Sequence, residues 1–161
     1  MEKFLEKLTE AEKIIKTTDH MVYTSFPMVK DKRLLLRVLS EIKSAITICI
    51  TSILQYEYLY KRISLYKEPR TNFRIFKEKC AQKYGITKEE IKLILELFEL
   101  AEKHERSPME FSRKGKIIIL SENSDPKIFS LDKSKEFLIL AKSILKKTKE
   151  IITENVKNFK R

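Results

Sequence analysis

The chain is organised around residues 32–63, KRLLLRVLSEIKSAITICITSILQYEYLYKRI, which contain neither Gly nor Pro. Asp31, directly before this stretch, is a typical helix N-cap, and apolar residues recur at helical spacing from Leu34 to Ile42. The middle, SAITICITSILQY (44–56), is apolar nearly all round, and its β-branched residues are also common in strands. The continuous helical pattern around it favours a helix, so the sequence predicts one long helix with a buried middle.

Further helices are predicted on both sides of this segment. Apolar residues at helical spacing indicate a helix over about 2–16. Residues 17–19 (TTD) can end it or cap a short second helix, and Pro27 is expected to break the pattern near Phe26. Another helix is predicted over 71–84, with Gly85 as its left-handed C-cap. Thr87 and Glu90 form a capping box that opens the next helix. The start signals over 107–110, SPME, predict one short helical turn, and Asp132 is the predicted cap of the last helix.

Two short β-branched runs stand before the last helix. Residues 116–120 (KIIIL) and 127–131 (KIFSL) flank the turn-rich stretch SENSDP, which predicts a β-hairpin over about 116–131. Only two Gly and four Pro occur in 161 residues, too few for the many turns of a sandwich or barrel. The predicted fold is therefore mainly all-α: an antiparallel bundle of four to five main helices with one β-hairpin before the C-terminal helix. One domain over residues 1–161 is expected.

Composition also predicts a cytoplasmic location. Cys49 and Cys80 show no disulfide framework and no metal-ligand spacing, and both are predicted to be reduced and structural. The N-terminus is charged and amphipathic from residue 2, unlike a signal peptide. The uncharged run 44–56 is too short to cross a membrane. No membrane association is expected.

The net charge of +11 is distributed unevenly. Residues 28–84 hold 13 Lys and Arg against 5 Asp and Glu, and residues 113–161 hold 13 against 6. The segment 85–112 between them is mildly acidic, with 4 against 7. Two basic blocks favour a partner that is a polyanion or an acidic protein surface.

The candidate nucleic-acid contacts are the basic clusters within these blocks, because a phosphate backbone binds several cations on one surface. They are Lys30, Lys32, Arg33, Arg37, Lys61, Arg62, Lys67, Arg70, Arg74, Lys77, Arg113, Lys114 and Lys116. Tyrosines lie beside the cluster from Lys61 to Lys77 and are available to stack on an unpaired base: Tyr56, Tyr58, Tyr60 and Tyr66. The alternative interpretations are that the cations form a solvated face and that the tyrosines pack in the core and at its rim.

Small polar residues form a stripe along the long helix. Its members recur at spacings of three and four: Ser40, Ser44, Thr47, Thr51 and Gln55. One interpretation is close helix–helix packing, with hydroxyls bonded to the preceding turn. The other is a homodimer seam formed by Ser44, Thr47, Thr51 and Gln55.

No catalytic, metal or cofactor signature accompanies the charge pattern. Two glycines cannot build a phosphate-binding loop, and His20 and His104 lie near predicted helix ends without a nucleophile or ligand set in sequence. We expect no enzyme activity, no cofactor and no metal. The remaining enzyme hypothesis requires a pocket that contains His104 with Glu102 or Arg106.

The order and length of the predicted elements resemble HEPN-type helical bundles, compact all-α domains of which many act on RNA. The ribonuclease signature of that family is an Arg followed four to six residues later by His. It is missing here, because Ile14, Ile15 and Lys16 precede His20, and Phe98, Glu99 and Leu100 precede His104. The resemblance therefore implies a non-catalytic member.

Two functional hypotheses follow. The first is a non-catalytic basic protein that binds RNA or associates with the ribosome, with RNA or a ribonucleoprotein as its partner. The second is a protein-interaction module or a subunit of a small complex, such as an antitoxin-like or scaffold partner, that binds an acidic protein surface.

Overall fold

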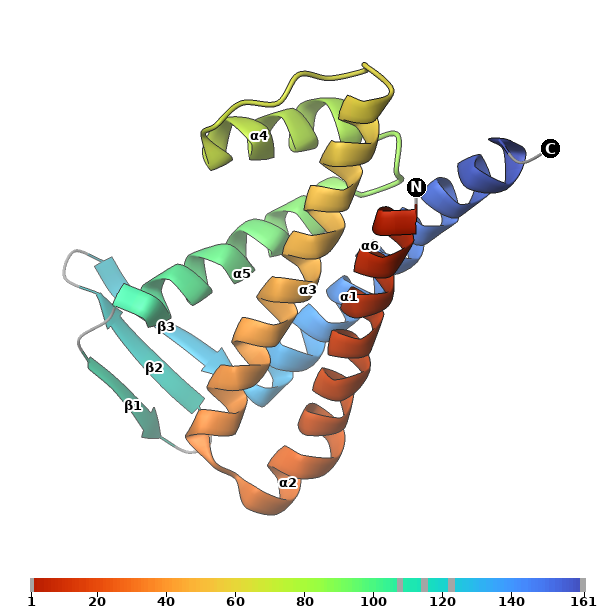
Figure 1. The fold of residues 1–161 in the computed structure, drawn as a ribbon. Coiled ribbons are helices and arrows are strands. Elements are labelled where there is room, and N and C mark those ends of the chain that lie inside the picture. Colours follow the sequence, from red (N-terminus) through yellow and green to blue (C-terminus); the bar gives the residue numbers. More distant parts are fainter. Residues whose placement is uncertain (1, 107–108, 114–115, 122–123, 160–161) are drawn as a thin grey trace.

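The computed structural model of the chain describes residues 2–106, 109–113, 116–121 and 124–159 (Figure 1). The molecule is mainly helical, and the long helix α3 (Lys32–Leu59) lies at its centre. Helices α1 (Glu2–His20), α5 (Lys88–Arg106) and α6 (Leu131–Phe159) pack around α3. α1 runs antiparallel to α3, and the predicted mainly helical bundle is confirmed.

Local signals explain where α3 begins and ends. The Asp31 carboxylate accepts a hydrogen bond from the backbone N–H of Arg33 at 2.8 Å, which confirms the predicted N-cap. At the other end, Lys61 adopts a left-handed backbone with a φ of 58°. The N–H groups of Lys61 and Arg62 then donate to the carbonyls of Tyr58 at 2.9 Å and Glu57 at 3.0 Å. This Schellman-type closure ends α3 before the predicted Ile63.

The first helix is longer than the sequence predicts. α1 continues to His20 and runs on through a π-helical turn (Met21–Ser25) into α2 (Phe26–Val29). The predicted break at Pro27 is therefore wrong in position. Pro27 lies in the first turn of α2, where a missing backbone N–H is tolerated, and the helical path ends at the left-handed Lys30.

The segment between α3 and α5 is a short helix followed by a π-helical turn. α4 (Pro69–Ile75) continues into the turn Phe76–Cys80, in place of one regular helix over 71–84. Gly85 has the predicted left-handed backbone, with a φ of 71°. The capping box is also confirmed, because Thr87 and Glu90 exchange two hydrogen bonds of 3.1 Å.

The predicted hairpin is present and is extended to three antiparallel strands. β2 (Lys116–Ser121) pairs with β3 (Ser124–Ser130), with Ile117 opposite Phe129, and β1 (Met109–Arg113) pairs with the other edge of β2. The predicted helical turn over 107–110 is wrong for residues 109–110, because pairing with β2 provides their backbone with a strand partner instead. Residues 107–108 of that prediction lie outside the described residues.

The last helix begins at Leu131, two residues earlier than the predicted Asp132 cap implies. The Ser130 hydroxyl, and not the Asp132 carboxylate, accepts the N–H of Lys133 at 3.1 Å. Side chains from the sheet and from α6 meet in the core, where the Phe129 and Phe137 rings stack 6.2 Å apart. In Figure 1 the sheet lies beside the end of α5 and the start of α6, on one side of the helical bundle.

Both cysteines are buried free thiols. Burial raises the pKa of Cys49 to about 12 and that of Cys80 to about 11, so the thiols stay protonated at neutral pH. Within the described ranges, no helix combines the length and the apolar character needed to cross a membrane.

Candidate functional site

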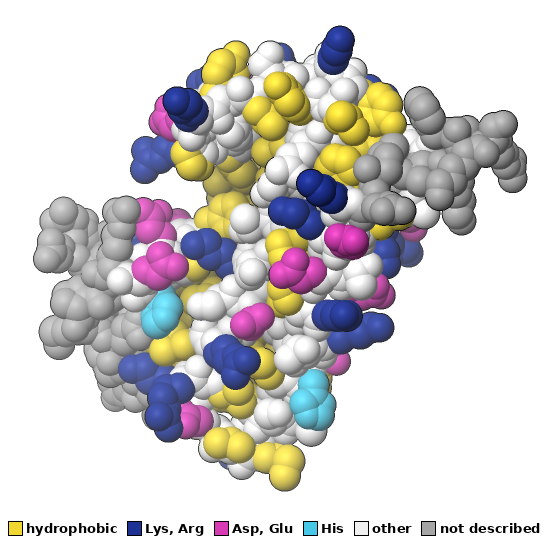
Figure 2. Space-filling model, in the orientation of Figure 1, with side chains coloured by type: hydrophobic (Ala, Val, Ile, Leu, Met, Phe, Trp, Pro, Cys, Tyr) yellow, Lys and Arg dark blue, Asp and Glu magenta, His cyan; other side chains and the backbone are white. Residues whose placement is uncertain are grey.

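The structure divides the predicted basic residues between the two ends of α3. Lys30 and Lys32 lie at its start, and the cluster from Lys61 to Lys77 follows its end. A helix of 28 residues is about 42 Å long, so the two clusters form separate surfaces. Figure 2 shows Lys and Arg side chains over the whole visible face, with fewer Asp and Glu beside them at the α4 end than elsewhere.

At the start of α3, residues far apart in sequence come together. Lys30, Lys32 and Lys116 line one hollow of about 800 Å³, which Asp132 also lines. Arg33 forms an ion pair with Asp31 at 3.0 Å, and Arg37 is exposed on α3. The side chain of Arg113 and the whole of Lys114 lie outside the described residues. This end of α3 therefore presents a mixed surface in which carboxylates accompany the cations.

The other end of α3 carries what we call the basic lobe, residues 61–79. It contains seven Lys and Arg and only two Glu. Arg62 pairs with the buried Glu57 at 3.2 Å, so it is not a free contact although its side chain is partly exposed. The other six cations are exposed, and none of them forms an ion pair within the part of the chain that the structure describes: Lys61, Lys67, Arg70, Arg74, Lys77 and Lys79.

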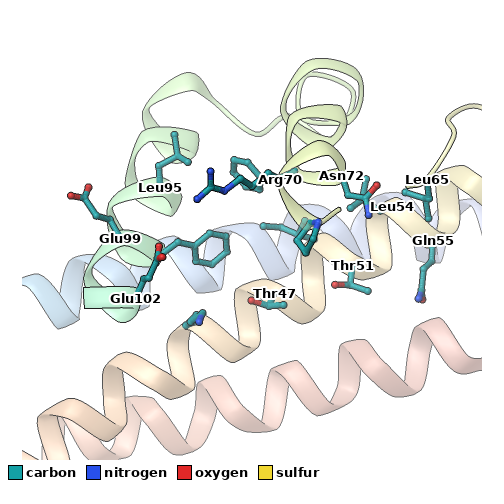
Figure 3. Close-up of a pocket in the computed structure, with 15 residues that line it drawn as sticks. Thr47, Thr51, Leu54, Gln55, Leu65, Arg70, Asn72, Leu95, Glu99 and Glu102 are labelled. Atoms are coloured by element: carbon teal, nitrogen blue, oxygen red, sulfur yellow. The ribbon is translucent and has the colours of Figure 1, made fainter. Parts of the chain in front are cut away.

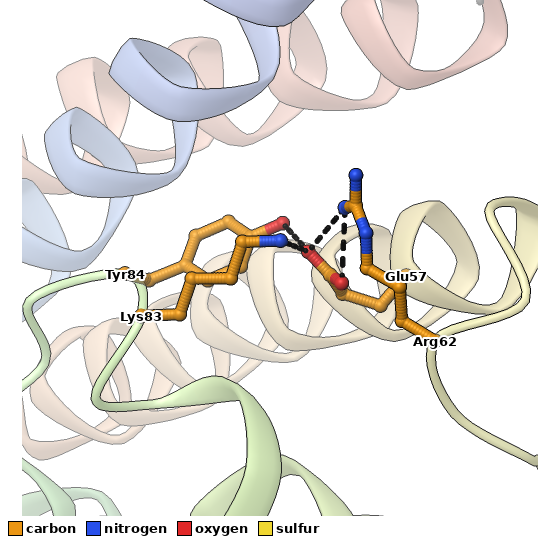
Figure 4. A network of polar contacts seen from close by, with 4 residues as sticks. All are labelled: Glu57, Arg62, Lys83 and Tyr84. Carbon is orange, nitrogen blue, oxygen red and sulfur yellow. Dashed lines mark hydrogen bonds and ion pairs between the residues drawn. The ribbon is translucent and has the colours of Figure 1, made fainter.

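A buried carboxylate holds both ends of this lobe (Figure 4). Glu57 is only 3% exposed on the last turn of α3. It accepts hydrogen bonds from Arg62, which precedes α4, and from Lys83 at 2.8 Å and Tyr84 at 3.0 Å, which follow the π-helical turn. One side chain thus anchors the start and the end of the chain segment that carries the free cations.

The charge of Glu57 is stabilised by its partners. Burial raises the pKa of the carboxyl group, but the hydrogen bonds from Lys83, Arg62 and Tyr84 outweigh burial and hold the pKa below its ordinary value. Burial and the neighbouring Glu57 raise the pKa of the Tyr84 phenol. Tyr84 therefore stays protonated and donates to the carboxylate.

The lobe has a small polar hollow on its surface. Seven residues line its volume of about 560 Å³: Ser64, Tyr66, Thr71, Arg74, Ile75, Glu78 and Lys79. Tyr66 is 58% exposed, whereas Tyr56 is buried in the core and Tyr60 packs against Tyr56 with ring centroids 5.0 Å apart. The tyrosines therefore divide between core packing and exposed positions.

A second depression lies between the lobe and the bundle (Figure 3). It is a groove of about 780 Å³ that α3, α5, α4 and the residues just before α4 enclose. Apolar side chains form much of its surface: Ile50, Leu54, Leu65, Pro69, Phe73, Leu95 and Phe98. Phe73 and Phe98 meet edge to face at 5.9 Å, which joins α4 to α5 across the groove.

The charges around the groove are unequally neutralised. Lys43 pairs with Glu105 at 3.7 Å, and Glu99 pairs with Lys103 at 3.1 Å and with Lys127 at 3.7 Å. Arg70 extends from α4 toward the α5 side of the groove (Figure 3) and has no such partner among the described residues. The groove is therefore apolar with one uncompensated cation at its edge.

The polar stripe of α3 lies along this groove. Thr47, Thr51 and Gln55 line it, and Ser44 is exposed beyond it. Close helix–helix packing of the stripe is therefore not observed, because Thr47 and Gln55 are exposed. The homodimer seam stays a prediction.

Residues of the enzyme hypothesis do not converge in this groove. Glu102 lines it, His104 does not, and the side chain of Arg106 lies outside the described residues. In the described ranges, no three His, Cys, Asp or Glu side chains gather closely enough to hold a metal ion.

Two important residues were missed from the sequence. Glu57 is the one charged residue between Lys43 and Lys61, a signal that was available in the apolar run. Lys79 joins Arg74 at the hollow through the π-helical turn, which sequence periodicity does not reveal.

The chain was compared with protein-family models, with curated proteins and with solved structures, and no match was found in any of the three, so the resemblance to HEPN-type bundles stays a prediction.

Proposed function

We propose that the protein binds RNA, without catalysis, through the basic lobe. The observation that carries this proposal is the set of six exposed lobe cations without an ion pair among the described residues. Cations that are already neutralised by carboxylates have little to gain from a phosphate, whereas these six are available for one. Association with the ribosome is one form of the same activity.

The arrangement of the lobe supports this proposal. Glu57 ties both ends of the segment to α3, so the stretch of chain that carries the cations is anchored to the bundle. Preorganised charges lose less conformational entropy on binding than charges on a free loop. Exposed Tyr66 adds an aromatic surface beside them.

The test is fluorescence anisotropy with a labelled single-stranded RNA over a series of salt concentrations. Five or six phosphate contacts predict a slope of log K against log salt of about −4, because each contact adds about −0.7 for a single strand. Binding that does not depend on salt, or a Kd weaker than about 10⁻⁴ M near physiological salt, contradicts the proposal. Polyglutamate is the competing ligand: equal affinity for it indicates an acidic protein partner instead of RNA.

A second candidate function is protein interaction through the groove. Its apolar lining and the uncompensated Arg70 fit an amphipathic helix that carries a carboxylate beside its apolar face. The polar stripe from Thr47 to Gln55 is about 12 Å long, a length that about two helical turns of a partner cover.

This candidate is tested with two synthetic helical peptides that have leucines at helical spacing and differ in one residue, Glu or Lys, beside that face. NMR titration is expected to shift the signals of Thr51, Leu95 and Phe98, with tighter binding of the Glu peptide, and Leu95→Asp is expected to remove binding. Equal affinity for both peptides, or NMR shifts at residues outside the groove, contradicts protein interaction through the groove. Self-association that Leu95→Asp removes instead identifies a second copy as the occupant.

A further inference from the structure

The hollow on the basic lobe combines three features on one side of α4. An exposed aromatic ring, Tyr66, lies with two cations, Arg74 and Lys79, and the hydroxyl residues Ser64 and Thr71. Its volume of about 560 Å³ falls within the range of about 300–1,000 Å³ typical of small-ligand sites. Glu78 is its one carboxylate, so the charge of its lining is positive.

The position of the aromatic ring is fixed by the backbone beneath it. The Asn72 side chain accepts the N–H of Tyr66 at 2.8 Å and donates to the Tyr66 carbonyl at 2.7 Å. Pro69 starts α4, and the Thr71 hydroxyl donates to Glu68 at 3.2 Å. The loop before α4 is thus closed onto the helix, and Tyr66 presents its ring to solvent from an ordered backbone.

The π-helical turn accounts for the pairing of the two cations. Residues five apart, such as Arg74 and Lys79, lie on different faces of a regular α-helix, which has 3.6 residues per turn. In the turn Phe76–Cys80 the helix widens, and the N–H of Ala81 donates to the carbonyl of Phe76, five residues back, at 2.9 Å. This wider turn lets both cations line the same hollow, and single π-helical turns are frequent at functional sites.

We propose that this hollow binds one unpaired nucleotide of a single-stranded RNA, with the base on the Tyr66 ring and the phosphate between Arg74 and Lys79. The inference rests on the proposed RNA binding and adds its specificity. A base in a duplex is stacked on both faces and cannot reach the ring, so the lobe discriminates single strands and loops from duplexes. Stacking is tolerant of base identity, so little sequence preference is expected.

The experiment compares a single-stranded 10-nucleotide RNA with a 10-base-pair RNA duplex, using the intact protein and three variants. Tyr66→Leu removes the ring, Tyr66→Phe keeps it, and Tyr58→Leu removes a tyrosine that is equally exposed but lies on α3 outside the hollow. Tyr66→Leu is expected to weaken single-strand binding about 5- to 100-fold, the range for one stacked base. For Tyr66→Phe and Tyr58→Leu, the affinity for the single strand is expected to change less than about twofold. The affinity of each variant for the duplex is also expected to change less than about twofold.

A second readout reports the stacking directly. A 2-aminopurine base in the single strand is expected to lose fluorescence on binding to the intact protein and to Tyr66→Phe, but not to Tyr66→Leu. The nucleotide site is overturned if single strand and duplex bind with equal affinity, or if Tyr66→Leu binds the single strand as tightly as the intact protein. In either case, a steep dependence of binding on salt would still support RNA binding by the lobe. If neither RNA binds, the proposed function itself fails.

Discussion

The basic lobe and α6 are both rich in lysine, yet their cations have opposite surroundings. In α6, Lys133 pairs with Glu96 at 2.8 Å and Lys149 with Glu12 at 3.0 Å, while Lys142 pairs with Asp19 and Lys147 with Glu90. In the lobe, six cations have no such partner among the described residues. The difference arises because α6 lies against α1 and α5, which carry carboxylates, whereas the lobe extends beyond the end of the bundle.

This contrast teaches that the charge of a segment does not identify a binding surface. The C-terminal block uses much of its charge to join helices, so a polyanion there has to compete with carboxylates already in place. Exposed ion pairs contribute only about 0–1 kcal/mol each to stability, but they still neutralise the cation locally. The lobe keeps its positive potential, and that potential is what attracts phosphate.

The largest expected effect comes from removing equal charge from either region. The lobe variant carries Lys67→Gln, Arg74→Gln and Lys79→Gln, and the α6 variant carries Lys142→Gln, Lys147→Gln and Lys149→Gln. Each triple removes three charges, so +11 becomes +8 in both. For the lobe variant, the slope of log K against log salt is expected to become shallower by about 2. Its affinity for single-stranded RNA near 0.1 M salt is expected to fall about 100-fold.

The α6 variant is expected to keep both the slope and the affinity. Anisotropy measures both variants, and circular dichroism confirms that each is folded. If the α6 variant loses as much affinity as the lobe variant, net charge and not the lobe governs binding, and the comparison fails.

The next effect concerns the carboxylate that anchors the lobe. Glu57→Gln removes a charge from a side chain that is 3% exposed and weakens its bonds to Arg62, Lys83 and Tyr84. We expect a loss of about 1–3 kcal/mol in the free energy of unfolding, the cost of leaving buried polar groups poorly paired. Urea unfolding measures it, with exposed Glu78→Gln as the matched control. Equal midpoints for the two variants contradict the anchoring role.

A smaller effect is expected when the stability of a variant that loses a paired lysine is compared with that of a variant that loses an unpaired one. Lys147→Gln removes the ion pair with Glu90, whose carboxylate also accepts from Ser143 and from the Thr87 N–H, and the Lys147 and Glu90 side chains are 28% and 14% exposed. We expect a loss of about 1 kcal/mol or less, whereas Lys67→Gln in the lobe is expected to have no measurable effect. The same urea experiment tests both. A larger loss from Lys67→Gln indicates that the lobe cations also stabilise the fold.

The smallest effect is a difference in pH dependence. Burial raises the pKa of Glu57, but its Lys83, Arg62 and Tyr84 partners lower it below 4.5 overall. A carboxyl group with a lowered pKa in the folded state adds stability that is complete above about pH 4.5 and is lost as the pH falls through the lowered value. The intact protein is therefore expected to lose more stability between about pH 6 and about pH 3 than Glu57→Gln does. If the urea midpoints of the intact protein and of Glu57→Gln fall by the same amount over this pH range, the prediction is wrong.

Several signals between near neighbours in sequence are confirmed, although Ser130 and not Asp132 caps α6. Asp31 caps α3, Thr87 and Glu90 form their reciprocal box, and Gly85 is left-handed. Other errors arose from pairing with a distant strand and from an unexpected left-handed residue. The 109–110 segment is a strand because β2 pairs with it, and α3 ends early because Lys61 adopts a left-handed backbone that closes the last turn.

The candidate sites show the same division. The sequence identified the lobe cations from Lys61 to Lys77 but also included Arg62, which faces Glu57, and omitted Lys79, which the π-helical turn brings to the hollow. It placed Thr47, Thr51 and Gln55 on one helix face but not in a groove, because α4 and α5 enclose that groove from other parts of the chain.

The sequence by itself determined the helices, most of their caps, the hairpin and the excess of positive charge, because these depend on residue type and on neighbours within a few positions. Only the tertiary structure decided which cations are neutralised, since that depends on which helices pack together. Lys147 and Lys67 look alike in the sequence. The first meets Glu90, 57 residues away, and the second meets no carboxylate within the described residues. Charge is local information, but neutralisation is a property of the fold.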